Sequence, residues 1–257
     1  MKLYYAPASS YSQRVLIALY EKQIDFTPVE VNLFDVESRT SVPGRATRSQ
    51  YLQINRFGKI PSLITDDGEV FLEANIIIEY LDGYYREIPL IPQDMKLALE
   101  MRMVERIVDV YINGGREALF KDSQRPLEER GKKEVIKAKG LLEEACNLLD
   151  EKLANRTWLV GKDFTLADCA AAPTLSYLRI VYNYEHLKNL TTYFKRLESQ
   201  TSVARVFNQG REQMMEMLST LKYPVNTHFE INGVYDNSWK YGKIINVVDQ
   251  LSKISNV

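Results

Sequence analysis

The sequence predicts an α/β domain that is followed by an all-helical domain. Strand and helix patterns alternate over residues 1–82, whereas apolar residues at helical spacing dominate residues 94–222. A proline-containing segment, residues 83–93, separates the two parts and is interpreted as a linker. The 257 residues are enough for two ordinary domains and leave an extension at residues 223–257.

The first strand and helix surround a cluster of serines. An apolar strand is predicted at residues 2–5, and a proline-containing turn leads from it to an amphipathic helix. Ser10 and Gln13 have the S-x-x-Q spacing of a capping box, so Ser10 is expected to cap this helix. Ser9 would then lie outside the helix with its hydroxyl facing a ligand. Because the first turn of a helix favours anions, a thiolate could bind there.

Further strands complete the α/β domain. Residues 24–33 alternate apolar and polar side chains, so the opening is a βαβ unit with parallel strands. Residues 34–49 are polar and are interpreted as a loop that leads into a short helix. Residues 60–64 and 70–72 are predicted strands, and the Asp67-Gly68 pair between them indicates a hairpin turn.

The helix that follows the hairpin offers a second group of candidate ligands. It opens with Glu73, Ala74 and Asn75. The N–H groups of Ala74 and Asn75 could hold a carboxylate, and the Glu73 carboxylate could hold an ammonium group. The alternative is that Glu73 is an ordinary acidic residue favoured by the helix dipole.

The second domain is predicted to consist of helices. Gly114-Gly115 interrupts a long amphipathic segment, which predicts a kink, a break or a close helix contact. Thr165 and Asp168 form a capping box before an almost wholly apolar segment, the expected central buried helix. The helices of this domain are expected at residues 95–119, 126–153, 165–182, 190–207 and 209–221.

Composition excludes several classes of function. A formal net charge of −1 argues against a nucleic-acid partner, and the apolar runs are too short to span a membrane. The N-terminus lacks the pattern of a signal peptide, and Cys146 and Cys169 fall within helical patterns, so a cytoplasmic location is expected. Two distant histidines without a nearby cysteine make a metal site improbable.

These features together resemble one known family. The element order, the serine cluster, Gly58-Lys59-Ile60-Pro61 and Glu73-Ala74 resemble the thioredoxin-like N-terminal domain of cytosolic glutathione S-transferases of the Ser type. The Thr165–Asp168 box resembles that of their all-α C-terminal domain. The resemblance covers about residues 1–220 and implies a homodimer that binds glutathione and a small electrophilic substrate.

The resemblance assigns roles to individual residues. Ser9 would stabilise the thiolate of glutathione, with Ser10 beside it. Lys59, Ile60 and Pro61 would bind the cysteinyl part, with Pro61 matching a cis proline of the family. Glu73 and Ala74 would bind the γ-glutamyl end.

Three departures from the family pattern bear on this assignment. Arg56 stands where a proline usually follows the asparagine, and Ala74 stands where a hydroxyl residue usually follows the acid. Losing that hydroxyl would remove a hydrogen bond of about 1 kcal/mol. Tyr5 resembles the catalytic tyrosine of the family's Tyr-type classes, so Tyr5 is an alternative donor to the thiolate.

Three functions follow as alternatives. The first is a glutathione transferase, in which the thiolate attacks an electrophilic carbon. The second is a glutathione-dependent isomerase of maleylacetoacetate or a dehalogenase, because Ser9-Ser10, Ser12 and Arg14-Val15 are similar to the zeta class, although Tyr11 stands where that class carries a cysteine. The third is a binding protein without turnover.

Overall fold

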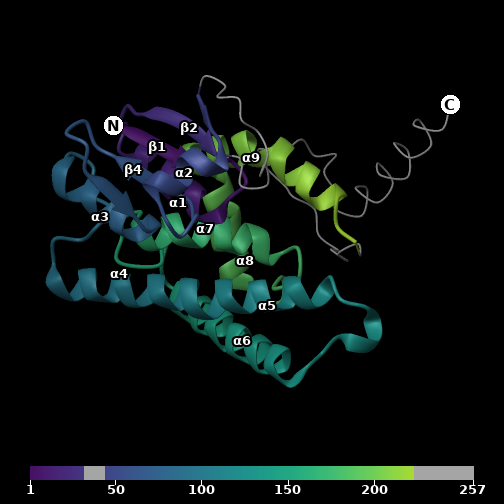
Figure 1. Cartoon of the computed structure of the whole chain (residues 1–257). Helices are drawn as coiled ribbons and strands as arrows, with labels where there is room; N and C mark the ends of the chain where they lie inside the picture. The colour runs from purple at the N-terminus through teal and green to yellow at the C-terminus, as the bar shows by residue number, and fades with distance from the viewer. Residues whose placement is uncertain (32–43, 223–257) are drawn as a thin grey trace.

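The computed structural model describes residues 1–31 and 44–222 as a five-stranded sheet with flanking helices and a helical domain (Figure 1). This two-domain α/β and all-α architecture is the predicted one. The predicted extension at residues 223–257 and most of the predicted loop lie outside the described residues. None of the described helices is long and apolar enough to cross a membrane.

The sheet has the order β3-β2-β1-β4-β5. Strands β1 (Lys2–Tyr5) and β2 (Thr27–Val31) are parallel and are joined by α1 (Ser10–Glu21), which confirms the predicted βαβ unit. Strands β4 (Ser62–Ile64) and β5 (Val70–Leu72) form the predicted antiparallel hairpin. The two-residue strand β3 (Arg45–Ala46), parallel to β2, was not predicted because it is too short to show periodicity.

Alternate residues of the strands face different helices. Leu3 and Leu63 pack in the main core with residues of α1 and of α3 (Ala74–Tyr84). Tyr4 and Val29 face the other way and pack with Tyr51 of α2 (Arg48–Ile54). The period of two along each strand therefore places α1 and α3 on one face of the sheet and α2 on the other.

The helical domain begins with a long rod. It consists of α4 (Met95–Ile107), the π-helical segment η1 (Val108–Asn113) and α5 (Gly114–Ser123), and α6 (Lys133–Leu153) runs beside it (Figure 1). A Cβ atom added to Gly115 would lie 2.6 Å from the Leu142 Cβ atom, so this glycine allows the close helix contact that the sequence suggested.

The predicted helix at residues 126–153 is too long at its start. A 3₁₀ turn, η2 (Leu127–Glu129), precedes α6, which begins only at Lys133. Gly131 lies between them with φ of 73°, a left-handed conformation that an α-helix cannot contain. The sequence predicts Pro126 as the first residue of the helix, whereas Pro126 precedes the separate turn η2.

The central helix α7 (Leu166–Leu178) is buried along its whole length, as predicted. The capping box is confirmed, because the Thr165 N–H donates to Asp168 Oδ2 at 2.8 Å. Asp168 Oδ1 also accepts hydrogen bonds from the Leu159 N–H and the Tyr193 hydroxyl. Asp168 therefore has a structural role, which agrees with the sequence interpretation.

The last two described helices divide at a different place from the one predicted. They are α8 (Lys188–Ser199) and α9 (Thr201–Ser219), separated by Gln200 with φ −68° and ψ 127°. The prediction placed the break after Phe207 and was wrong. Neither glycine nor proline marks Gln200, and the prediction gave no weight to Ser199, Thr201 and Ser202 around it, although serine and threonine favour helix ends.

The two adjacent glycines at the start of α5 should respond in opposite ways to alanine. Gly115→Ala should destabilise the protein by about 1–3 kcal/mol because its Cβ atom would collide with Leu142. Gly114→Ala, where no atom lies within 4 Å of the added Cβ, should stabilise it by up to about 1 kcal/mol. Urea unfolding of both variants tests the close contact, and equal effects would contradict it.

Candidate functional site

Ser9, not Ser10, caps the first helix. The Ser9 N–H donates to the Ala6 carbonyl at 3.0 Å, and this turn leaves Ser9 in extended backbone just before α1. The Ser9 Oγ atom then accepts the Ser12 N–H at 3.3 Å. Ser10 is the first helical residue and is buried, so the predicted capping role of Ser10 is wrong.

Gln13 is used differently from the predicted capping box. Its side-chain Nε2 atom donates to the Pro7 carbonyl at 2.9 Å and so closes the turn that precedes the helix. Three serines within four positions all suit an N-cap chemically, so spacing could not select among them. The tight turn from Ala6 to Ser9 places Ser9 at the N-cap position.

Capping does not exhaust the hydrogen-bonding capacity of Ser9. Its oxygen accepts one hydrogen bond, and its hydroxyl proton remains able to be donated. The side chain is partly buried, and within the described ranges the N–H groups of Ser10 and Tyr11 find no backbone acceptor. A hydroxyl and the N–H groups of a first helical turn thus form a set of donors suited to an anion.

Tyr5 lies at the end of β1 and packs against the main core. Burial raises the pKa of its phenol, and Glu30 and Tyr20 raise the pKa further. The phenol therefore stays protonated at neutral pH and keeps its capacity to donate. The choice between Ser9 and Tyr5 as the donor stays a prediction.

The segment Lys59–Ile60–Pro61 is held by two side chains of the preceding helix region. The Lys59 carbonyl accepts a hydrogen bond from Asn55 Nδ2 at 2.7 Å and another from the Tyr51 hydroxyl. The Ile60–Pro61 peptide bond is cis, as the family resemblance implies. Sequence reasoning missed Tyr51 and gave Asn55 no role, although a buried phenol needs a hydrogen-bond partner.

Glu73 occupies the N-cap position of α3 with φ of 67°, in the left-handed region that non-glycine residues rarely adopt. Its exposed side chain makes no capping hydrogen bond and remains available to a cation. Ala74 is buried directly behind it. The Asn75 Oδ1 atom is buried and has no hydrogen-bond partner in the described part of the chain.

Side chains of the helical domain approach the start of α1. Asn113 Nδ2 donates to the Tyr11 hydroxyl at 2.9 Å, and Arg116 Nε donates to Asn113 Oδ1 at 2.9 Å. Burial, followed by the nearby Asp109 carboxylate, raises the pKa of Tyr11 to about 12. Tyr11 is therefore a neutral phenol beside the candidate site and cannot serve as a base near neutral pH.

A buried arginine connects α1 to the helical domain. Arg14 has no exposed surface, and its Nη1 atom lies 2.9 Å from Asp109 Oδ1 and 3.5 Å from Glu105 Oε1. Its Nη2 atom donates to Thr174 Oγ1 at 3.1 Å. Burial raises the pKa of Glu105, while Asn75 and Arg14 oppose that rise.

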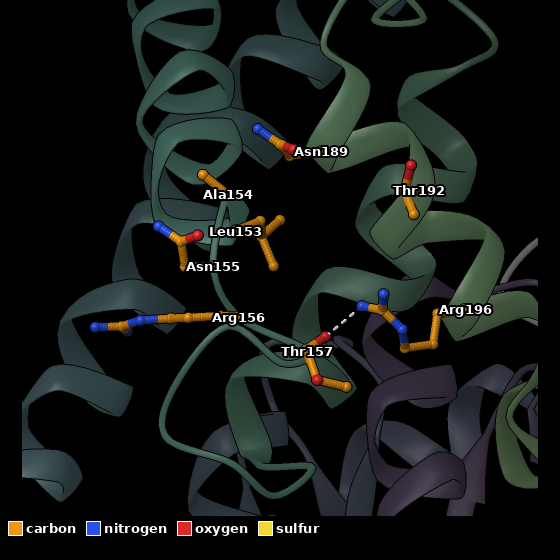
Figure 2. Close-up of a pocket in the computed structure, with 8 residues that line it drawn as sticks. All are labelled: Leu153, Ala154, Asn155, Arg156, Thr157, Asn189, Thr192 and Arg196. Atoms are coloured by element: carbon orange, nitrogen blue, oxygen red, sulfur yellow. Dashed lines mark hydrogen bonds between the residues drawn. The ribbon is translucent and has the colours of Figure 1, made fainter.

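A separate pocket of about 360 Å³ lies in the helical domain, between the end of α6 and α8 (Figure 2). Across it, Arg196 Nη1 donates to the Thr157 carbonyl at 2.5 Å, while Arg156 points away and pairs with Glu100. The pocket contains none of the predicted site residues. Its lining is Leu153, Ala154, Asn155, Arg156, Thr157, Asn189, Thr192 and Arg196.

The structure is that of a two-domain protein, with an α/β domain whose helix α1 begins at donors suited to an anion and a helical domain packed on it. Residues 3–89 match the family profile of the glutathione S-transferase N-terminal domain, and residues 107–201 match that of the C-terminal domain. The chain therefore belongs to the glutathione S-transferase family.

Relatives within this family carry different names. The chain is 25% identical over 224 residues to a stringent starvation protein A homolog of Coxiella burnetii, covering 84% of this chain and 96% of the relative. It is 30% identical over 173 residues to a probable maleylacetoacetate isomerase of Caenorhabditis elegans, covering 65% and 73%. A glutathione S-transferase structure from Methylobacillus flagellatus with GSH bound shares 29% identity and a TM-score of 0.67, covering 80% and 98%.

The corrected cap predicts different stabilities for the two adjacent serine variants. Ser9→Ala should lower the free energy of unfolding by about 0.5–2 kcal/mol because the Ser12 N–H loses its acceptor. Ser10→Ala should cost less, since Ser10 makes no capping bond. Chemical denaturation of both variants tests this, and the reverse order would restore Ser10 as the cap.

Proposed function

We propose that this protein is a glutathione transferase in which Ser9 stabilises the thiolate of glutathione for attack on an electrophilic small molecule. The observation that carries the proposal is the Ser9 hydroxyl, which caps α1 and retains its proton in a chain of this family. The thiolate would accept that proton as a hydrogen bond and would lie near the N–H groups of the first turn.

The chemistry needs no general base. A free thiol has a pKa of about 8.5, so little of it is ionised at neutral pH. Lowering this pKa by about two units requires about 2.7 kcal/mol of preferential stabilisation of the anion, which a hydroxyl and a helix N-terminus can supply. The thiol proton leaves to solvent, and the sulfur then bonds to the electrophilic carbon as the leaving group departs with its electron pair.

The remainder of glutathione would bind to the first domain. Ile60 would meet the cysteinyl backbone, with Lys59 and Pro61 on either side and the Lys59 carbonyl held by Asn55. Glu73 would pair with the γ-glutamyl ammonium, because its carboxylate is exposed and makes no capping bond. Ala74 offers only its backbone N–H to the γ-glutamyl carboxylate, so this end would be held by fewer bonds than in relatives with a hydroxyl there.

Titration of the bound thiol tests the proposal directly. The ultraviolet absorbance of the thiolate, followed against pH in the glutathione complex, should give a pKa well below that of free glutathione. Ser9→Ala should raise the bound thiol pKa by up to about two units and slow turnover at neutral pH to match. Tyr11→Phe should leave the thiol pKa unchanged, because the Tyr11 hydroxyl is already engaged by Asn113 and by the Asp109 carboxylate.

The alternatives give different results in the same titration. A raised thiol pKa in Tyr5→Phe, with Ser9→Ala unchanged, would make Tyr5 the donor. A native protein that binds glutathione without lowering its thiol pKa would be a binding protein without turnover. Activity on a maleyl compound but not on aryl halides would favour the isomerase, which the similarity to the Caenorhabditis elegans relative keeps as the second candidate.

We also propose that two copies of the chain associate through an apolar patch on α3 and α4. Within the described residues this patch includes Leu99, 59% exposed, and Met103, 51% exposed, one helical turn apart. The Arg102–Glu79 ion pair joins α4 to α3 beside them. Exposed apolar side chains that recur every four residues along one helix face favour a protein partner over solvent. The exposed large apolar residues of α3 and α4 are Ile76, Tyr84, Met95, Leu99 and Met103.

Charges placed in the patch should separate the copies. The double variant Leu99→Glu/Met103→Glu should elute as a monomer in size-exclusion chromatography with light scattering, where the native chain should be a dimer. Leu127→Glu is the control, because Leu127 is 78% exposed but lies on the distant η2 turn. An unchanged mass for the double variant, or a monomeric native chain, would overturn the dimer.

A further inference from the structure

The residue before Ser9 is held on both sides by the helical domain. The Ala8 N–H donates to Gln213 Oε1 of α9 at 2.8 Å. The Ala8 carbonyl accepts a hydrogen bond from the Tyr177 hydroxyl of α7 at 2.5 Å. Both peptide units that flank Ala8 are therefore fixed by side chains more than 160 residues away in the chain.

Helix α9 reaches this turn through a glycine. A Cβ atom added to Gly210 would lie 2.6 Å from the Pro7 carbonyl oxygen and 2.7 Å from Gln13 Nε2. No larger residue could occupy this position without moving the turn. Gly210 lies one helical turn before Gln213, so the close approach of the backbone brings the Gln213 amide to Ala8.

A second glutamine of α9 provides a contrast. Gln209 also joins the two domains, since its side chain and the Tyr20 hydroxyl hydrogen-bond at 3.1 Å, but this contact is exposed and lies near the far end of α1. Gln209 thus contributes to domain contact alone. Gln213 binds the backbone immediately before Ser9, where a small displacement changes the direction of the Ser9 hydroxyl.

We infer that Gln213 and Tyr177 are positioning residues for the Ser9 hydroxyl, so that the second domain sets the geometry of the thiolate donor in the first. The inference rests on the proposed function of Ser9. A displacement of about 1 Å in a reacting group can cost as much as 100-fold in rate, so hydrogen bonds that fix the turn affect chemistry beyond their effect on stability.

Matched variants separate positioning from stability. Gln213→Met removes the acceptor with little change in shape and should raise the pKa of bound glutathione and lower kcat roughly tenfold at neutral pH. The glutathione KM should change less, because Glu73 and Ile60 lie apart from the turn. Gln209→Met should lower the melting temperature to a similar degree but leave kcat and the thiol pKa unchanged. Tyr177→Phe, which keeps the ring, should behave like Gln213→Met.

A double-variant cycle shows whether Gln213 acts through Ser9. In a Ser9→Ala background, Gln213→Met should produce no further rise in the thiol pKa. A full additional rise of the thiol pKa in that background would overturn the inference. So would an unchanged thiol pKa in both Gln213→Met and Tyr177→Phe in the native background.

A readout without glutathione distinguishes failure of this inference from failure of the proposed function. Amide hydrogen exchange at Ala8 and Ser9 should accelerate in Gln213→Met but not in Gln209→Met. Exchange could be accelerated in Gln213→Met while the native protein fails to lower the thiol pKa of bound glutathione. The turn would then be held as inferred, but Ser9 would have another role. Unchanged exchange in Gln213→Met would overturn the inference itself.

Discussion

The burial of Arg14 constrains the arrangement of the two domains. A guanidinium without exposed surface is stable only with close partners, and its partners Glu105, Asp109 and Thr174 all belong to the helical domain. Two carboxylates meet Arg14 here, and the other oxygen of Asp109 pairs with Arg106 at 3.4 Å, so two cations face the two carboxylates. The first domain cannot bury α1 in this way unless the second domain is docked in one orientation.

That docking reaches the candidate site through α1. Arg14 lies little more than one turn after Ser9, so the ion pairs that hold Arg14 also hold the end of the helix that Ser9 caps. The Lys59–Pro61 segment and Glu73 depend instead on the first domain, where Tyr51 and Asn55 fix the Lys59 carbonyl. The proposed thiol end of the site is therefore set by both domains, and the peptide end by one.

The sequence predicted the order of the elements well and their ends less well. The parallel βαβ unit, the hairpin at Asp67-Gly68 and the Thr165–Asp168 box all carry local signals, namely periodicity, a turn pair and capping chemistry. The division at Gln200 has only a weak signal, because neither glycine nor proline marks it and Ser199, Thr201 and Ser202 around it do not single out one position. Helix ends decided by tertiary packing cannot be located from local preference alone.

The same limit explains what was missed at the site. Several serines suited the cap, and only the turn from Ala6 selected Ser9. The contacts of Ala8 with Tyr177 and Gln213 join positions far apart in the chain, and neither side chain is unusual for the helix that carries it. Asn55 was visible only as part of a departure from a family motif, although its amide holds the Lys59 carbonyl.

The finding that Ser9 is the cap overturns the expectation that its hydroxyl is left free by a cap at Ser10, but it is compatible with the proposed chemical role. Aspartate, asparagine, serine and threonine all cap helices well, because each offers an oxygen to the N–H groups of the first turn. An aspartate would also place a carboxylate beside the bound sulfur, and this like charge would raise the thiol pKa. A hydroxyl accepts the helix N–H through its lone pairs and still donates its proton to the anion. A serine at this position is therefore compatible with both helix capping and the proposed thiolate binding.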